Sequence, residues 1–449
     1  MKRVFVTEPY LLTLDPAHEM QVVWIQRSPQ PGEVEYGSSH VLGRCVQAQC
    51  YPLTGLRLPA SEQGYAPDPE DNPLMELWQC VATIRGLQPG TRVFYRCTCD
   101  NYTTRVYDFH TAPLSGEPFR FAQMSDLQGF LPCDESAYQI GRMHPDFILF
   151  SGDMAYYSWR ADQWFDLEEP WQGEESRRRA FFPCMQQQGG ARLMQYCPVF
   201  VCPGNHEVDD FRVGTDPEFA VQDDKWTYSI FMQLFRPLYP EMDASIRGKR
   251  WYSVDYSDLH LVSLNIWRWS AWGAETAPGW RLMDEIAPDS PQIRWLTEDL
   301  SQSKAKFKWV IEHWHLLNKG DDVQYNLCQP HVDEAGVVTY PHDYGQNLMA
   351  IFEKHGVNAV SYGHSHVYER YFCRGVHYIE AAFLGICYRG EDHRLHPSGL
   401  EPLVEDNSRC SFLMVHRNGE GLVGVGMYLD DPPVEFDRYT IAPEPTGKH

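Results

Sequence analysis

The sequence lacks both a long apolar run and an excess of positive charge. No stretch among its 449 residues is apolar over the roughly 18 positions that a membrane-spanning helix needs, so we expect no membrane partner. The formal net charge of −23 at pH 7 repels phosphate backbones, and we therefore expect no nucleic-acid partner. An anionic small substrate would need local positive charge, which bound metal cations can supply.

The sequence also lacks a recognisable signal peptide and a regular cysteine pattern. Glu8 and Pro9 interrupt the apolar segment after a basic start, and no small-residue cleavage site follows, so we expect a cytoplasmic protein, or a secreted one if a leader was removed. Thirteen cysteines are an odd number without repeated spacing. A chain of this length does not need disulfides to fold, so we expect most cysteines to be reduced and buried. Cys97 and Cys99 are expected to pack in a core rather than bind a metal.

Residues 1–113 are typical of an all-β domain. The runs MQVVWIQ, LWQCVATIRGL and RVFYRCTC are short and rich in β-branched and aromatic residues, and QPGT between two of them predicts a turn. Many short strands of this kind favour a β-sandwich. The following FHTAPLSGEP contains Pro113, Gly116 and Pro118 and is typical of a linker, so we expect a second domain over 119–449.

The second part of the chain, 119–449, alternates predicted strands with predicted helices. Apolar runs such as FRFAQMSD, DFILFSGD, PVFVCPGNHE, FKWVIEHWH and VNAVSYGHSH each end in a polar cluster. SPQIRWLTEDLSQSK and YGQNLMAIFEKHG predict helices, the second with Gly356 as its C-cap. This alternation predicts an α/β domain, in which ligands collect outside the carboxyl ends of strands, so we expect the polar clusters to meet in space.

The polar clusters contain side chains that bind metals through oxygen and nitrogen. Such a set suits hard or borderline ions, because it contains no thiolate. A structural zinc needs only four ligands, so the larger number favours two ions, or one ion with many supporting contacts. Each residue alone also has an ordinary explanation as a cap, a turn or a packed histidine. The clusters are Asp126; Asp153 with Tyr156; Asn205 with His206; His313 with His315; and His364 with His366.

In this order the clusters resemble the motifs of the purple acid phosphatases, a branch of the calcineurin-like metallophosphoesterase superfamily. The family pattern is D-x-G, G-D-x-x-Y, G-N-H-(D/E), V-x-x-H and G-H-x-H; this chain reads DLQ, GDMAY, GNHE, VIEH and GHSH, starting at 126, 152, 204, 310 and 363. WYSVDYSDLHLVSLN, HVYER and TIRGLQPGTRVFYR are also similar to family segments. The resemblance implies an N-terminal fibronectin type III-like sandwich and a C-terminal α/β metallophosphoesterase domain, a β-sheet sandwich flanked by helices.

The resemblance further implies a binuclear metal centre. The first ion would be Fe(III) and the second a divalent Fe, Zn or Mn. Asp153 would bridge the ions, while the imidazoles of His364 and His366 would diverge, one toward each. A phenolate suits a strongly Lewis-acidic ion, because the pKa of free tyrosine is about 10. The family ligands correspond to Asp126, Asp153, Tyr156 and His366 for the first ion, and to Asp153, Asn205, His313 and His364 for the second.

The implied reaction is hydrolysis of a small phosphate ester, with a phosphomonoester of acid phosphatase type as the expected substrate. A metal-bound hydroxide would attack phosphorus in line, because coordination lowers the pKa of water from 15.7 to about 7. His206 is expected to contact phosphate or assist the leaving group, with Glu207 orienting or charging its imidazole. Two alternatives stay open: hydrolysis of a phosphodiester or another phosphorus ester at the same metals, and a non-catalytic metal-binding protein.

Some residues depart from the family pattern or have no clear counterpart in it. Gln128 replaces a glycine and His315 replaces a common proline, which makes both candidate substrate-binding residues. His331 and His342 lie after the fourth motif without a clear family equivalent. The tryptophan-rich segment 265–289 could bind an organic leaving group, or it could form an interdomain or oligomer surface; the sequence is compatible with both hypotheses. The oligomeric state is likewise open.

Overall fold

The fold was analysed in a computed structural model of the chain. The residues that this structure describes are 4–61, 64–129, 133–167, 180–186, 192–207, 229–241, 249–266, 290–314, 316–317, 331–332, 338–339, 344–380, 400–406, 408–419 and 421–443.

The N-terminal part forms two antiparallel sheets around a shared core. One sheet has the strand order β1-β2-β6-β5 and the other β4-β3-β7-β8, with β9 also paired to β7. Buried and partly exposed residues alternate along β6, as a strand with one face on a core requires. Trp24, Cys80 and Tyr95 lie in that core. The β-sandwich prediction is confirmed. The strands are β1 (Tyr10–Leu12), β2 (Glu19–Gln26), β3 (Glu33–Gly37), β4 (Arg44–Gln47), β5 (Gln49–Leu53), β6 (Leu77–Arg85), β7 (Arg92–Cys99), β8 (Tyr102–Thr103) and β9 (Tyr107–His110).

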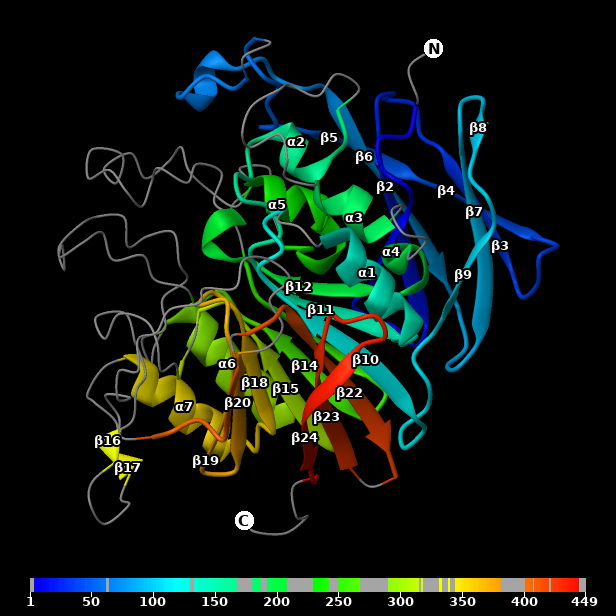
Figure 1. The fold of residues 1–449 in the computed structure, drawn as a ribbon. Coiled ribbons are helices and arrows are strands. Elements are labelled where there is room, and N and C mark those ends of the chain that lie inside the picture. The colour runs from blue at the N-terminus through cyan, green and yellow to red at the C-terminus, as the bar shows by residue number, and fades with distance from the viewer. Residues whose placement is uncertain are drawn as a thin grey trace.

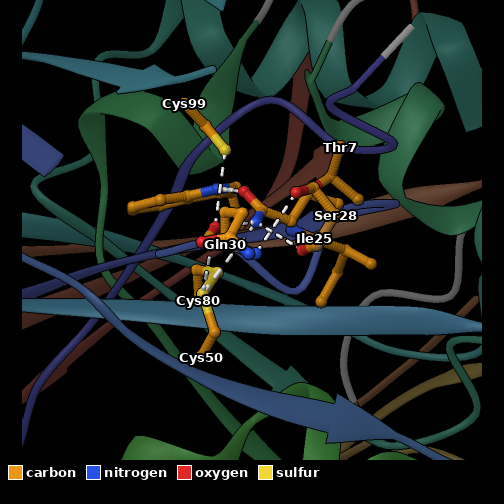
Figure 2. The surroundings of a disulfide bond; sticks show 9 residues. Thr7, Ile25, Ser28, Gln30, Cys50, Cys80 and Cys99 are labelled. Atoms are coloured by element: carbon orange, nitrogen blue, oxygen red, sulfur yellow. Dashed lines mark hydrogen bonds between the residues drawn. A yellow bond between two sulfur atoms is a disulfide. The ribbon is translucent and has the colours of Figure 1, made fainter. Parts of the chain in front are cut away.

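The cysteines of the described chain are mostly reduced and buried, as expected, with one exception. Cys50 and Cys80 lie opposite each other on β5 and β6 and form a disulfide (Figure 2). The Cys99 sulfur lies 3.7 Å from the Gln30 carbonyl oxygen, close to this bond. Eight other described cysteines are free, and six of these are buried. Cys97 and Cys99 share one face of β7, as residues two apart on a strand do, and pack in the core.

The part from Phe119 onward contains two larger sheets. Their strand orders are β12-β11-β10-β22-β23-β24 and β13-β14-β15-β18-β20-β19-β21. β10, β11 and β12 are parallel to one another, and so are β14, β15, β18 and β20. The first sheet consists of β10 (Phe119–Met124), β11 (Phe147–Ser151), β12 (Val199–Cys202), β22 (Ser411–Asn418), β23 (Gly421–Tyr428) and β24 (Val434–Ile441). The second consists of β13 (Tyr252–Tyr256), β14 (Leu259–Ser263), β15 (Phe307–Ile311), β18 (Ala359–Tyr362), β19 (Tyr368–Cys373), β20 (Val376–Glu380) and β21 (Val404–Asp406); a separate pair is β16 (His331–Val332) with β17 (Val338–Thr339).

Both predicted helices form, and the predicted C-cap of the second, Gly356, is in place. α6 (Pro291–Gln302) begins at Ser290, whose side chain accepts the N–H of Ile293, and α7 (Tyr344–Lys354) is followed by Gly356 at a left-handed φ of 64°. Within the described residues, none of the helices has the length and apolarity needed to cross a membrane. The other helices are α1 (Cys133–Arg142), α2 (Ala161–Trp164), α3 (Phe181–Gln186), α4 (Leu193–Tyr196) and α5 (Ser229–Leu234), with short 3-10 turns η1 (Pro69–Asp71), η4 (Asn205–Glu207) and η7 (Arg236–Leu238).

The two larger sheets pack against each other, with helices outside them. Phe121 of the first sheet contacts Trp309 of the second edge to face, and the Val201 carbonyl accepts hydrogen bonds from the side-chain hydroxyls of Tyr252 and Ser263. Figure 1 shows α6 and α7 beside the second sheet and α1, α3 and α4 beside the first. This is the predicted α/β arrangement, and it brings the carboxyl ends of β10, β11, β12, β15 and β18 to one region.

The apolar core of the larger part extends into the N-terminal sandwich. Tyr10 and Leu12 of β1 belong to the same buried cluster as Phe182 and Phe235. The Tyr10 hydroxyl and the Gln79 amide both donate to the Leu234 carbonyl, at 2.7 and 2.8 Å. The sandwich is therefore packed against the larger part through buried contacts.

Candidate metal centre

Each predicted ligand lies in a sharp loop just after a parallel strand. Asp126 follows β10, Asp153 follows β11 and His313 follows β15. The backbone is left-handed at Asp126 and Asp153, with φ of 53° and 56°. Residues other than glycine adopt this conformation at a cost, which is typical of functional loops. The turns thus direct these side chains across the sheet ends instead of along the strands.

Glycines in three of these loops allow the loops to approach one another. A Cβ on Gly152 would lie 2.7 Å from the ring of His313, one on Gly204 would collide with Asp153, and one on Gly363 would collide with Asp126. Real Cβ contacts are not this short. The glycines of the GD, GN and GH motifs are therefore required by the close packing of the ligand loops themselves.

The residues assigned to the second ion lie together. His313 Nε2 and His364 Nδ1 each lie 3.0 Å from the Asn205 side-chain oxygen. His313 Nε2 is also 3.3 Å from Asp153 Oδ2. Potential ligand atoms of Asp153, His313 and His364 all lie within 4.8 Å of one another. The four predicted side chains thus converge on one small volume.

The residues assigned to the first ion are beside this group. His366 Nε2 is 3.3 Å from Asp126 Oδ1, and both side chains are buried. Tyr156 shares the loop of Asp153, and its ring centroid lies 4.4 Å from that of His206. His364 and His366 do diverge, one toward Asn205 and one toward Asp126. They do so because both lie in a left-handed loop, with φ of 84° and 58°, since residues two apart on a strand would share a face.

The buried carboxylates favour positive charge among the candidate ligands. Burial lowers the pKa of His313, but Asp153 and then Asp126 outweigh it and raise this pKa to about 10. Burial raises the pKa of Asp153, but His313 and His206 hold it well below its usual range. Burial lowers the pKa of His206, which faces the same carboxylate. The negative charge that raises this pKa would also favour bound cations.

The predicted partner of His206 is wrong. His206 Nδ1 lies 2.9 Å from the Tyr156 carbonyl oxygen, which directs the other ring nitrogen toward Asp153 Oδ2, 3.8 Å away. The Glu207 carboxylate instead accepts the backbone N–H groups of Asp153, Met154, Ala155 and Gly204. It therefore ties the GD and GN loops together and does not orient the imidazole.

The remaining candidates have different outcomes. Gln128 is buried, and its amide donates to Asp153 Oδ2 at 2.8 Å. His315, His342 and residues 267–289 of the tryptophan-rich segment lie outside the described residues, and His331 falls in the short strand β16. The sequence reasoning missed Trp314, whose ring lies 4.0 Å from that of His364 at a tilt of 31°. The available signal in the sequence is an aromatic residue directly after His313, a predicted ligand.

The chemistry of the donor set fits metal ions. Carboxylate, amide and imidazole atoms converge at hydrogen-bond distances. Where two such atoms both direct lone pairs at each other, a proton or a cation must lie between them. The residues present are those that bind Fe, Zn or Mn through oxygen and nitrogen.

The fold and site together define the class: a β-sandwich followed by an α/β metallophosphoesterase domain, with potential metal ligands at the strand ends. The chain belongs to the calcineurin-like phosphoesterase family, whose model matches residues 119–368, and the purple acid phosphatase N-terminal domain matches residues 8–111. It is therefore a purple acid phosphatase-like hydrolase acting on phosphoric ester bonds.

Two relatives and one solved structure are similar to this chain. An acid phosphatase from Aspergillus ficuum is 23% identical over 96% of this chain and 83% of its own length. Acid phosphatase type 7 from Mus musculus is 25% identical over 78% of this chain and 67% of its own length. The structure is similar to purple acid phosphatase PPD1 from yellow lupin (Lupinus luteus), with a TM-score of 0.61 at 15% identity, covering 97% of this chain and 74% of the lupin chain. That likeness supports the fold alone.

Proposed function

We propose that the protein is a binuclear metal-dependent hydrolase of phosphate esters, with phosphomonoesters as preferred small-molecule substrates. The observation that carries this proposal is the convergence of Asp153, His313 and His364 within 4.8 Å, beside the Asp126–His366 pair. One ion would need only part of this set, whereas two adjacent ions account for all of it.

Asp153 is the residue best placed to serve both ions. Its Oδ2 lies 3.3 Å from His313 Nε2, and its loop also carries Tyr156. We propose Asp126, Asp153, Tyr156 and His366 for Fe(III), and Asp153, Asn205, His313 and His364 for a divalent Fe, Zn or Mn. When bound, such ions would supply Lewis acidity, neutralise phosphate charge and lower the pKa of water to about 7.

His206 is proposed to act on the substrate side of the site. Because the Tyr156 carbonyl fixes Nδ1, Nε2 faces the ligand cluster. Burial lowers the pKa of the imidazole, which favours a neutral ring whose Nδ1–H donates to the Tyr156 carbonyl and whose Nε2 is an acceptor. Protonation of Nε2, which the Asp153 charge favours against burial, would let it donate to a phosphate oxygen or supply the proton that a leaving group needs.

The preference for monoesters is tested with aryl phosphate and bis-aryl phosphate on one sample of protein whose metal content is measured. We expect faster turnover of the monoester, and a loss of at least about 100-fold for His206→Ala, the usual scale for a general acid. Turnover of the diester alone would contradict the substrate class. An absence of hydrolysis after reconstitution with Fe, Mn or Zn would instead favour the non-catalytic alternative.

A further inference from the structure

Gln128 stands in the first motif where the family has glycine, and its backbone keeps a glycine-like conformation. Its φ is 44°, in the left-handed region that disfavours side chains. The residue is only 3% exposed. A bulky polar side chain in a strained, buried position requires compensating contacts.

The contacts of Gln128 lead to Asp153. Its side-chain amide donates to Asp153 Oδ2 at 2.8 Å, and its backbone N–H donates to the Asp153 carbonyl at 3.1 Å. The other carboxylate oxygen, Oδ1, accepts the backbone N–H of His206 at 2.9 Å. Each oxygen of Asp153 therefore has a protein donor, and the pair of donors fixes the plane of the carboxylate.

The oxygen bound by Gln128 is the one on the His313 side. His313 Nε2 lies 3.3 Å from Oδ2, and Asn205 lies beside His313. Loss of the amide donor would free this oxygen more than Oδ1, which keeps the His206 N–H. Loss of this donor would therefore weaken binding of the ion assigned to His313, His364 and Asn205 more than binding of the ion assigned to Tyr156.

We propose that Gln128 is a positioning residue that orients Oδ2 of Asp153 and thereby sets the affinity of the His313-side metal site. This inference rests on the proposed binuclear function. Hydrogen-bond partners of metal ligands typically change metal affinity by about 10- to 100-fold, so a measurable effect is expected from one amide donor.

Two substitutions separate orientation from packing. Gln128→Gly restores the family residue and removes backbone strain, so it should fold well. Gln128→Met keeps the side-chain length and fills the same space without an N–H donor. Asp100→Gly is the matched control. Asp100 is exposed in the turn between β7 and β8 and also has a positive φ, of 50°. This substitution therefore measures the effect of relieving a left-handed backbone conformation alone.

The measurement is a titration of Zn²⁺ into protein preloaded with one Fe³⁺, followed by competition with a chelator and by the visible absorption of the iron. We expect the Zn²⁺ dissociation constant to rise about tenfold in both Gln128 variants and to stay unchanged in Asp100→Gly, with the iron absorption retained throughout. Wild-type Zn²⁺ affinity in Gln128→Met would overturn the inference, because the side chain would then only fill space. Failure of the wild type to hold two ions would overturn the proposed function and the inference with it.

Discussion

At the scale of single residues, Glu207 is the clearest structural determinant of the site. Its buried carboxylate accepts four backbone N–H groups, two on each oxygen, from the loops that carry Asp153 and Asn205. A carboxylate can accept on both oxygens, whereas a carboxamide has only one accepting oxygen.

Glu207→Gln should therefore loosen both loops. Two backbone donors would face an NH₂ group, and we expect the free energy of unfolding to fall by roughly 2–6 kcal/mol, because each unsatisfied buried donor costs about 1–3 kcal/mol. Metal affinity should fall in parallel. Urea denaturation and metal analysis measure both, with the exposed Glu405→Gln as the control for loss of one charge. Unchanged stability would show that the carboxylate is dispensable.

Tyr156 gives a second prediction at this scale. If its phenolate binds Fe(III), the oxidised iron form should absorb in the visible range, and Tyr156→Phe should abolish the band while leaving the ring contact with His206 in place. Absorption spectra of both proteins, at equal iron content, check this. A colourless but fully active di-iron wild type would contradict the tyrosinate assignment.

The convergence of the candidate ligands could be predicted from sequence, because the motifs give residue types at strand ends, whereas the contacts that support these side chains could not. The adjacency of His206 and Glu207 predicts a contact between them, but the Glu207 carboxylate accepts the backbone N–H groups of Asp153 and Gly204. Gln128 is predicted from the sequence to bind substrate, whereas its amide donates to Asp153 Oδ2. Both roles depend on how separate loops meet, which no local pattern encodes.

At the scale of elements, the strands and the two main helices were predictable from the sequence pattern. A cluster of charged side chains from different elements was not. His260 on β14 lies 2.7 Å from Asp255 on β13 and 2.8 Å from Asp299 on α6. The first contact follows from hairpin register, since these residues are paired across the strands. The second depends on where α6 packs.

This cluster should make stability depend on pH. Burial lowers the pKa of His260, but its two carboxylate partners outweigh this and raise the pKa to about 9. Because this value is above the unfolded pKa of about 6.5, the stabilisation is complete below about pH 6.5 and is lost as pH rises to about 9.

Urea denaturation between pH 6 and 9.5 tests the effect. We expect His260→Gln to remove roughly 1–3 kcal/mol of stability at the acid end and little at the alkaline end, after allowing for the exposure of Asp255. His18→Gln, at an exposed histidine that also pairs with a carboxylate, should have little effect at either end. A constant difference between wild type and His260→Gln across the range would contradict the account.

At the scale of the whole molecule, the sequence predicted two units joined near 113–119 but not how closely they pack. Tyr10 and Gln79 bind the Leu234 carbonyl, and the Tyr95 hydroxyl binds the Gln195 carbonyl at 2.8 Å. These contacts join residues that are at least 100 positions apart in the chain, so local composition could not predict them.

We propose that residues 1–113 and 119–449 are two domains that unfold together. Removing the first would expose the apolar residues of the larger core that Tyr10 and Leu12 cover. Scanning calorimetry of the intact chain should give one cooperative transition, and Gln79→Ala should lower its midpoint without splitting it. Two well-separated transitions would show that the interface contributes little.

The claim that Asp153 joins two metal ions is the centre of this account, and metal stoichiometry tests it most directly. After reconstitution with Fe and Zn and removal of free metal, elemental analysis should give about two ions per wild-type chain and less than one in Asp153→Asn, because a shared ligand supports both sites. One ion or none in the wild type, or two ions retained in Asp153→Asn, would contradict it.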